Sequence, residues 1–352
     1  MRALRTITQV IQAALAISIA PHAAQAQKVE DFYRNTPIRL IVGYDNGGGY
    51  DVYARVLSRH IGRHISGNPV VAVQNMPGAG SLVSVNYLYN VAPKDGSVIG
   101  TFARNIPLLA VLGDSDKVKF DIRKFTWLGS SSSYEEDAFV LWVRRDAKIK
   151  TLDDARKPGG PSLQLGGTGE GSTGTDVPKI LADTIGLNVR QITGYKGSGD
   201  LFLAIDRGEI EGRITDFSSV RGARPHYLQA DGPVAPWLQF ARRTRHPDLP
   251  NVPTARELAK DAAALAFIET TELPFITSRP FVAPPGLSPE RAEVLKKAFM
   301  AAHKDPQYLA EAEKLKIGIS PIDGVEVLAL IDKLAAAPTD VLDKVRALYK
   351  PQ

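Results

Sequence analysis

Short apolar runs alternate with amphipathic segments along most of the chain after residue 37. Residues 38–42, 70–73 and 98–102 are runs rich in β-branched and aliphatic side chains, a pattern typical of buried strands. Between them, residues 51–65 and 81–91 place apolar side chains on one face at helical spacing. Strands that alternate with helices in this way predict a parallel sheet in an α/β fold.

The same alternation returns after Trp127 and then gives way to a helical tail. The strand-like runs are 139–143, 163–165, 189–192 and 212–215, and the helical patterns are 176–185 and 200–207. From Ser288 onward the pattern is mostly helical, and Ser288-Pro289 and Asp305-Pro306 each place a capping residue before a proline at the first helical position. We therefore predict two α/β lobes followed by a helical C-terminal portion.

The first 26 residues have the layout of a secretory signal peptide. Arg2 and Arg5 make a basic start, residues 7–20 are mainly apolar, and Ala24-Gln25-Ala26 is a small-x-small site. The alternative is an amphipathic first helix of the mature fold. We predict cleavage after Ala26 and a periplasmic location.

Composition excludes several kinds of chemistry. The 352 residues contain no cysteine, which removes thiolate zinc sites, iron–sulfur clusters and cysteine nucleophiles. The net charge of +5 falls by two when the predicted signal peptide is removed, and the remaining basic residues are scattered. Nucleic-acid binding requires a concentrated basic face, so we expect no nucleic-acid partner.

Motifs for catalysis or metal binding are weak. Residues 169–174 match G-x-G-x-x-G, but the next predicted strand supplies no acid for a ribose. A P-loop, H-E-x-x-H and G-x-S-x-G are all absent from the sequence. His60 and His64 have the spacing of a two-histidine metal site, yet Arg59 and Arg63 beside them favour a solvated helix face. We expect no catalytic residue, no metal and no cofactor.

Three glycine-rich junctions between strands and helices carry the clearest signal. Residues 49–52 (GYDV), 174–177 (GTDV) and 195–200 (YKGSGD) each place an acid near the start of a predicted helix. Helix N-termini carry free N–H groups that suit carboxylate or phosphate oxygens, and glycine lets the backbone approach a ligand. The other interpretation is that the glycines make turns and the acids cap the helices. Both interpretations stay open.

The order and spacing of several motifs make the chain resemble a known family. The motifs are Pro37-Ile38-Arg39-Leu40-Ile41-Val42, Gly47-Gly48-Gly49-Tyr50-Asp51, Ala54-Arg55, Asn75-Met76-Pro77-Gly78-Ala79-Gly80, Ala92-Pro93-Lys94-Asp95-Gly96, Tyr195-Lys196-Gly197, residues 247–254 (PDLPNVPT) and residues 281–289 (FVAPPGLSP). Over nearly the whole mature length, the chain resembles the extracytoplasmic receptors of tripartite tricarboxylate transporters, also called Bug receptors.

The resemblance implies a two-lobed periplasmic binding protein, type II-like, with mixed central sheets and a ligand cleft between the lobes. We expect a signal peptide at 1–26, the first part of lobe 1 at 27–128, lobe 2 at 129–245, and a return to lobe 1 with C-terminal helices at 246–352. The implied function is to capture a small organic acid and deliver it to a membrane permease. We expect a monomer; the alternative is a sensor subunit that presents its ligand to a signalling partner.

The resemblance also implies which residues bind the carboxylate. The loops at 44–51 and 167–173 grip it, an aromatic lines the pocket, and lobe 2 adds a polar contact. The expected ligand-binding residues are Tyr44, Asn46, Gly47, Gly48, Asp51, Gly80, Asn105, Thr168, Ser172, Thr173, Tyr195 and Asp216.

Two acids depart from the family pattern. Asp45 and Glu170 place negative charges in loops that should face an anion, and a buried carboxylate beside a ligand carboxylate is costly. Either these acids point to solvent, or the ligand carries an amine or amide or is bridged by a cation.

Overall fold

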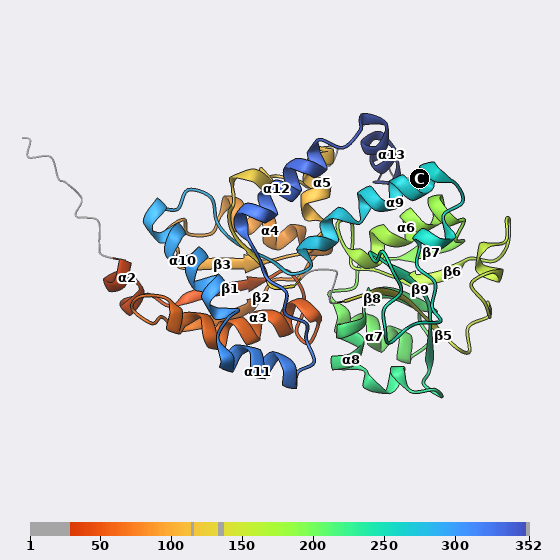
Figure 1. Cartoon of the computed structure of the whole chain (residues 1–352), viewed down its shortest axis with the longest axis horizontal. Coiled ribbons are helices and arrows are strands. Elements are labelled where there is room, and N and C mark those ends of the chain that lie inside the picture. The colour runs from red at the N-terminus through yellow and green to blue at the C-terminus, as the bar shows by residue number, and fades with distance from the viewer. Residues whose placement is uncertain (1–28, 114–115, 133–136, 350–352) are drawn as a thin grey trace, which may run out of the picture.

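Two mixed β-sheets form the centres of two lobes (Figure 1). The computed structural model describes residues 29–113, 116–132 and 137–349, so the predicted signal peptide lies outside the described residues. The strand order is β11-β4-β10-β3-β1-β2 in the first sheet and β7-β6-β8-β5-β9 in the second. The predicted two-lobed α/β fold is confirmed.

The first sheet combines parallel and antiparallel strands. It contains β1 (Ile38–Val42), β2 (Val71–Asn75), β3 (Val98–Thr101), β4 (Thr126–Ser130), β10 (Pro280–Ala283) and β11 (Ile322–Asp323). Strand β1 pairs in parallel with β2 and β3, whereas β10 pairs antiparallel with β3 and β4. The carboxyl ends of β1 and β3 therefore lie at the same edge of the sheet, where ligands bind in open α/β folds.

The second sheet repeats this arrangement. It contains β5 (Phe139–Arg144), β6 (Leu163–Gly166), β7 (Val189–Ile192), β8 (Gly212–Asp216) and β9 (Val234–Phe240). Strand β6 runs parallel to β7 and β8, and β5 runs antiparallel to β8 and β9. The carboxyl ends of β6, β7 and β8 thus share one edge.

Helices cover the sheets. They are α2 (Val29–Asn35), α3 (Gly49–His60), α4 (Leu82–Asn90), α5 (Ile106–Leu112), α6 (Thr173–Ile185), α7 (Ser198–Asp206), α8 (Phe217–Ala223), α9 (Ala262–Thr271), α10 (Pro289–Ala302), α11 (Pro306–Lys314), α12 (Gly324–Ala335) and α13 (Thr339–Tyr349). The predicted caps of the tail are confirmed, because the Ser288 and Asp305 side chains accept backbone N–H groups at the starts of α10 and α11. In the described part of the chain, no helix combines the length and apolar character needed to cross a membrane.

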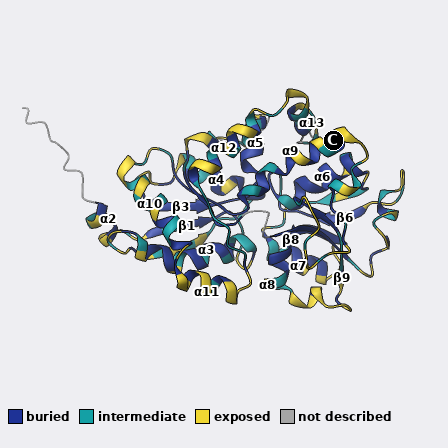
Figure 2. Ribbon diagram, in the orientation of Figure 1, coloured by how far each residue is buried: buried dark blue, intermediate teal, exposed yellow. Residues whose placement is uncertain are grey.

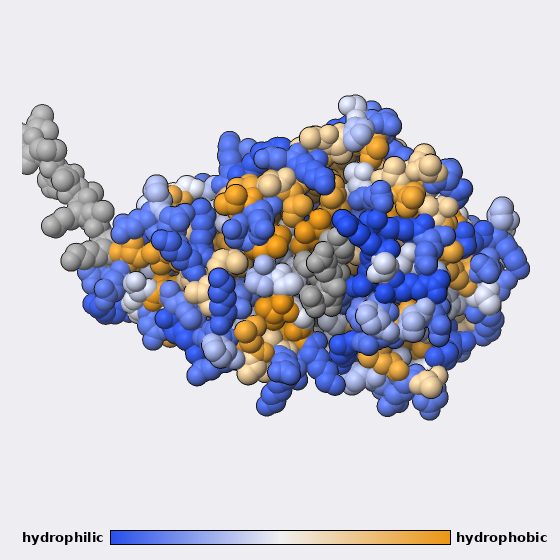
Figure 3. Space-filling view, in the orientation of Figure 1, coloured by the Kyte–Doolittle hydropathy of each residue, from blue (hydrophilic) through white to orange (hydrophobic). Residues whose placement is uncertain are grey.

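The inner strands of both sheets are buried, whereas edge strands such as β2 and β7 are partly exposed, as are the outer helix faces (Figure 2). Every residue of β3 and β8 is buried, as expected for strands covered on both faces. The face drawn in Figure 3 is mostly hydrophilic, with hydrophobic residues interspersed. Clusters of buried apolar residues form a separate interior in each lobe.

Helix α5 belongs to the interiors of both lobes. Its Ile106 and Leu109 pack in the core of the first lobe, whereas Leu108 and Leu112 pack with the core of the second. Helix α12 does the same, because its C-terminal Leu334 joins the core of the second lobe. These helices connect the lobes on the side opposite α8 and α11 (Figure 1).

The chain passes between the sheets after β4 and again before β10. Helix α9 packs against α6, and its Phe267 and Ile268 lie in the core of the second lobe. The domain boundaries at residues 129 and 245 stay a prediction. The position of α9 favours a later second crossing, between α9 and β10.

Buried His303 gives the fold a pH dependence. Its ring nitrogens lie 2.7 Å from the Phe299 carbonyl oxygen and 2.8 Å from the Ser131 hydroxyl. Burial lowers the pKa of His303 from 6.5 to about 4. As the pH falls, His303 is therefore protonated near pH 6.5 in the unfolded chain but only near pH 4 in the folded protein. We expect this residue to lower the free energy of unfolding by about 1.4 kcal/mol per pH unit as the pH falls through this window.

Urea unfolding of His303→Gln at several pH values tests this expectation. In this variant, the free energy of unfolding should depend less steeply on pH, because the contribution of His303 is gone. The His226→Gln variant, in which an exposed histidine is replaced, should keep that contribution. Equal slopes in the two variants would contradict the role of His303.

Candidate functional site

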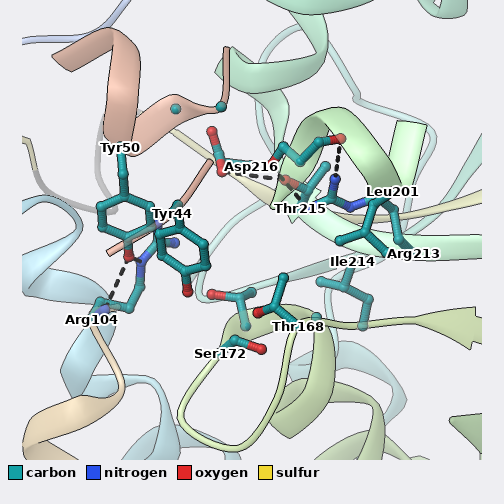
Figure 4. A pocket seen from close by; sticks show the side chains of 15 residues that line it. Tyr44, Tyr50, Arg104, Thr168, Ser172, Leu201, Arg213, Ile214, Thr215 and Asp216 are labelled. Carbon is teal, nitrogen blue, oxygen red and sulfur yellow. Dashed lines mark hydrogen bonds between the residues drawn. The ribbon is translucent and has the colours of Figure 1, made fainter. Parts of the chain in front are cut away.

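A small cavity lies between the lobes, at the edge where the strand ends meet. Its volume is about 40 Å³, on a scale where one water needs roughly 10–15 Å³. The residues that line it are Tyr44, Gly48, Gly49, Tyr50, Arg104, Thr168, Ser172, Thr173, Gly174, Ser198, Leu201, Arg213, Ile214, Thr215 and Asp216 (Figure 4). Both lobes contribute, so a molecule in this cavity would contact both.

Three helices begin at the cavity. Helices α3, α6 and α7 start beside it, and among the described residues no side chain caps them at Gly48, Ser172 or Gly197. The acids near the helix starts turn back to the preceding loops: Asp51 accepts from Gly47 N (2.9 Å), Asp176 from Gly171 N (3.1 Å) and Asp200 from Lys196 N (3.2 Å). The acids thus stabilise the loops and leave the cavity side of the helix starts without a capping side chain. The acids therefore bond to the loops before the helices, and anion binding at the helix starts stays a prediction.

Gly49 is required because an ion pair lies against it. A Cβ at this position would sit 2.6 Å from the Ser219 hydroxyl and 2.8 Å from Arg279 Nη2. The same nitrogen donates to Asp216 Oδ2 at 2.7 Å, and this pair is buried. The glycine therefore allows the start of α3 to meet the second lobe.

Asp216 is held in its charged form. Burial opposes its ionisation, but Arg279 in contact and Arg104 farther away hold the pKa of Asp216 below its usual range. Its oxygens also accept from the hydroxyls of Ser218 and Ser219. Burial, with the charge of Asp216, raises the pKa of the neighbouring Asp137.

Arg104 is buried at the cavity wall. It follows β3 and is 1% exposed. Its backbone N–H and Nε donate to the Tyr50 hydroxyl at 3.0 and 3.1 Å, and the guanidinium lies 4.1 Å from the centroid of the Phe139 ring. Its Nη1 is buried and has no hydrogen-bond partner among the described residues.

Arg213 is buried on the other lobe. It lies in β8, is 6% exposed and donates to the backbone carbonyl and hydroxyl of Ser198 at 3.4 and 3.3 Å. Burial lowers the pKa of Arg213 to about 10, because no carboxylate in the described chain forms a salt bridge with it. Its Nε is buried and has no hydrogen-bond partner in residues 29–113, 116–132 and 137–349.

The sequence-based prediction missed both arginines, although each leaves a signal. Arg104 directly follows the apolar run that becomes β3, at the carboxyl end of a parallel strand. Arg213 interrupts the run that becomes the fully buried β8. A cation inside a buried strand is unusual, because burying a charge is costly without a partner.

Half of the expected ligand-binding residues line the cavity. These are Tyr44, Gly48, Thr168, Ser172, Thr173 and Asp216. Tyr44 stacks on Tyr50 with ring centroids 4.8 Å apart, and burial raises its pKa, which keeps its hydroxyl neutral. Four of these residues, Tyr44, Thr168, Ser172 and Thr173, carry hydroxyl groups.

The other six lie around the cavity and are not among its lining residues. Asp51 is buried and bonded to Asn75, Arg55 and Gly47 N; Asn105 donates to Asp176; Gly80 touches the opposite lobe; Asn46, Gly47 and Tyr195 belong to the surrounding loops. A direct ligand contact by these residues stays a prediction.

The two acids that depart from the family pattern also lie outside the cavity lining. The Asp45 carboxylate accepts from Asn46 N at 2.8 Å, and Glu170 pairs with Lys117 at 3.3 Å. The structure therefore favours the first of the two interpretations, in which these acids do not face the ligand.

His60 and His64 contact acids of a neighbouring helix. His60 Nε2 lies 2.6 Å from Glu311, and His64 Nε2 lies 3.0 Å from Asp305. The expected solvated face is wrong for His60, which is buried between α3 and α11. Among the described residues, no group of three or more histidines and acids is arranged to hold a metal ion.

Comparison with known proteins identifies the family. Residues 53–335 match the family described as tripartite tricarboxylate transporter family receptor. The chain belongs to this family. A Cupriavidus necator relative, the "UPF0065 protein in gbd 5'region", is 28% identical over 302 residues, which cover 84% of this chain and 82% of the relative. The family consists of solute-binding receptors, so the chain is not an enzyme.

Solved structures show the same two-lobed fold. The periplasmic binding protein BugD matches with a TM-score of 0.68 at 17% identity, covering 89% of this chain and 98% of its own. MatC from Rhodopseudomonas palustris, solved with bound malate, matches with a TM-score of 0.66 at 18% identity, covering 88% and 99%. The predicted periplasmic binding protein fold is thereby confirmed.

Gly80 brings the two lobes into contact beside the cavity. A Cβ there would sit 2.4 Å from the Glu170 carbonyl oxygen and 2.9 Å from that of Gly169, across the cleft. We expect Gly80→Ala to force the lobes apart and to increase the radius of gyration measured by small-angle X-ray scattering.

Gly113→Ala is the matched control. Gly113 has a similar backbone conformation, with φ of +73° against +62° at Gly80, but open space around it. Both variants should lose stability through left-handed strain of about 1–2 kcal/mol. Identical scattering from the two variants would show that the contact at Gly80 does not hold the lobes together.

Proposed function

We propose that this protein is a periplasmic receptor that captures a small organic acid between its lobes and delivers it to the permease of a tripartite tricarboxylate transporter. The observation that carries the proposal is the cavity at three helix starts, which is lined by two buried arginines that form no salt bridge within the described part of the chain. Helix N-termini and guanidinium groups both bind carboxylates. Malate, the ligand of the related MatC structure, is an acid of this kind.

The remaining parts of the proposal follow from the sequence. Residues 1–26 direct export and are removed, the receptor acts as a monomer, and the lobes close on the ligand. Tyr44, Thr168, Ser172 and Thr173 offer neutral donors to the bound acid from the two lobes. Asp216 positions Arg279 and the start of α8, where its side chain caps the helix.

A melting-temperature panel tests ligand binding. The purified protein is heated with monocarboxylates, dicarboxylates, tricarboxylates, amino acids and amides, each with and without a divalent cation. An acid present at about 100 times its Kd should stabilise the fold by ~2.7 kcal/mol. For a chain of this length, this corresponds to a shift of roughly 2–4 °C or slightly less. No shift with any acid, using protein unfolded and refolded to remove bound ligand, would overturn the proposal.

Delivery to a permease is tested in cells. Deletion of the gene should abolish uptake of the labelled acid that gives the largest melting shift, and a plasmid copy should restore uptake. Unchanged uptake combined with a lost transcriptional response to the acid would instead support the sensor alternative.

A further inference from the structure

A second, larger groove lies between the lobes next to the cavity. Its volume is about 350 Å³, and Gly49 lines both the groove and the cavity. One wall is α8 of the second lobe, and the other is the start of α3 with the end of α11 in the first lobe. We infer that this groove is the surface on which the permease docks, through a segment that carries acidic and apolar side chains. The inference rests on the proposed function and names the surface that delivery would use.

The first argument is the charge of the groove. Three cations, Arg221, Lys314 and Lys316, line it, and no acid is among its described lining residues. Arg221 pairs with Asp248 at 2.6 Å, whereas Lys314 and Lys316 are exposed and form no salt bridge in the part of the chain that the structure describes. Opposite charges across an interface speed association and select the partner. The complementary partner is therefore acidic.

The second argument is the apolar surface between these cations. Val52 and Ile317 line the groove, and Leu315 beside them is 37% exposed. Apolar side chains surrounded by charged ones are typical of a docking surface, in which the apolar part is covered and the charged rim stays in contact with water. Because the groove is concave, a protruding protein segment fits it better than a flat lipid surface does.

The third argument is the position of the groove. Helices α8 and α11 lie on the side of the molecule opposite α5 and α12, which connect the lobes (Figure 1). A partner in the groove would contact both lobes and would lie next to the cavity, since Gly49 borders both. The walls come from different lobes, so their spacing depends on the relative position of the lobes. A partner seated here would stand where it can take the ligand from the cavity.

The backbone at Lys316 supports a role for its side chain. Lys316 ends α11 with a φ of +55°, its N–H donates to the Glu313 carbonyl at 2.9 Å, and the Ile317 N–H donates to the Ala312 carbonyl at 3.0 Å. This is the Schellman arrangement, in which glycine is the usual residue at the left-handed position. Lysine is less favourable than glycine in that conformation. The helix end therefore carries a cation at the groove where glycine would stabilise it more.

Another cavity, of about 440 Å³, lacks these features. It is lined by Arg243, Arg256 and Lys333 together with Glu269 and Glu272. Arg256 pairs with both of these acids, so the charges there partly compensate one another. The cavity shares no lining residue with the one between the strand ends, and Lys333 places it at α12, on the side where the lobes are connected.

Uptake and ligand binding measured on the same variants test the inference. Plasmid copies of the gene are expressed in the deletion strain, with the labelled acid that gives the largest melting shift. The double variant Lys314→Glu, Lys316→Glu should reduce uptake about tenfold or more, because it reverses the charge of the groove. The double variant Lys297→Glu, Lys333→Glu is the matched control: it makes the same change in charge at exposed positions on α10 and α12, outside the groove, and should keep uptake. Both should bind the acid in isothermal titration calorimetry with Kd values within about twofold of each other.

Two further variants separate docking from folding. Lys316→Gly should melt no lower than the original protein, because glycine favours the left-handed conformation, and should still lower uptake. Full uptake by this variant would show that Lys316 has no part in docking. In the permease, changing the acidic residues of its extracytoplasmic loops to lysine, one at a time, should restore uptake by the Lys314→Glu, Lys316→Glu receptor at the residue that contacts the groove.

The outcomes separate this inference from the proposed function. If the Lys314→Glu, Lys316→Glu receptor supports uptake as well as the control, the groove is not the docking surface, while the receptor function stands. If the unaltered gene does not restore uptake, delivery to the permease fails and this inference fails with it. Flotation with vesicles of phosphatidylglycerol and phosphatidylcholine examines the other anionic surface. Binding to phosphatidylglycerol that is lost in the Lys314→Glu, Lys316→Glu protein would make the groove a lipid site and overturn the acidic protein segment.

Discussion

Burying a guanidinium group without a salt bridge is costly, and two such groups, Arg104 and Arg213, lie at one cavity with no salt-bridge partner among the residues that the structure describes. The rest of the cleft is arranged around that constraint. Aromatic rings support the guanidinium planes, the Tyr50 hydroxyl accepts from Arg104, and a separate acid neutralises Arg279. The protein is therefore less stable than it would be if these charges were paired.

Close backbone approach is the second condition for the site. Gly49 lies against the Asp216–Arg279 pair, and Gly80 lies against the carbonyl groups of the facing loop. Any side chain at these positions would occupy the space in which the lobes meet. The glycines thus have two roles: they form turns, and their lack of a side chain lets the two lobes come into contact.

Much of the fold could be predicted because it depends on local patterns. The alternation of apolar runs and amphipathic segments gave most strands of both sheets, and the Ser288 and Asp305 caps marked two helices of the tail. The starts of α3, α6 and α7 were also predicted, since glycine and acids mark them. Helix α9 was not, and its membership of the second lobe depends on packing against α6.

The two arginines could not be placed from the sequence, because their role depends on long-range structure. Whether Arg213 faces the cleft depends on the face of β8 that meets the first lobe, and Arg104 contacts Phe139 only after the lobes have come together. The directions of Asp45 and Glu170 were left open for the same reason. Glu170 pairs with Lys117, which comes from the other lobe, and a contact of this kind cannot be seen in the sequence.

Helix α5 has a mechanical consequence, because two of its residues, Ile106 and Leu109, pack in the core of the first lobe and two others, Leu108 and Leu112, in that of the second. A rotation that opened the cleft and kept those contacts would have its axis close to this helix. Displacement grows with distance from an axis, so the α3, α8 and α11 side of the molecule would travel farthest (Figure 1). Helix α5 would then act as the hinge, and the cleft would open on the side of the molecule farthest from it.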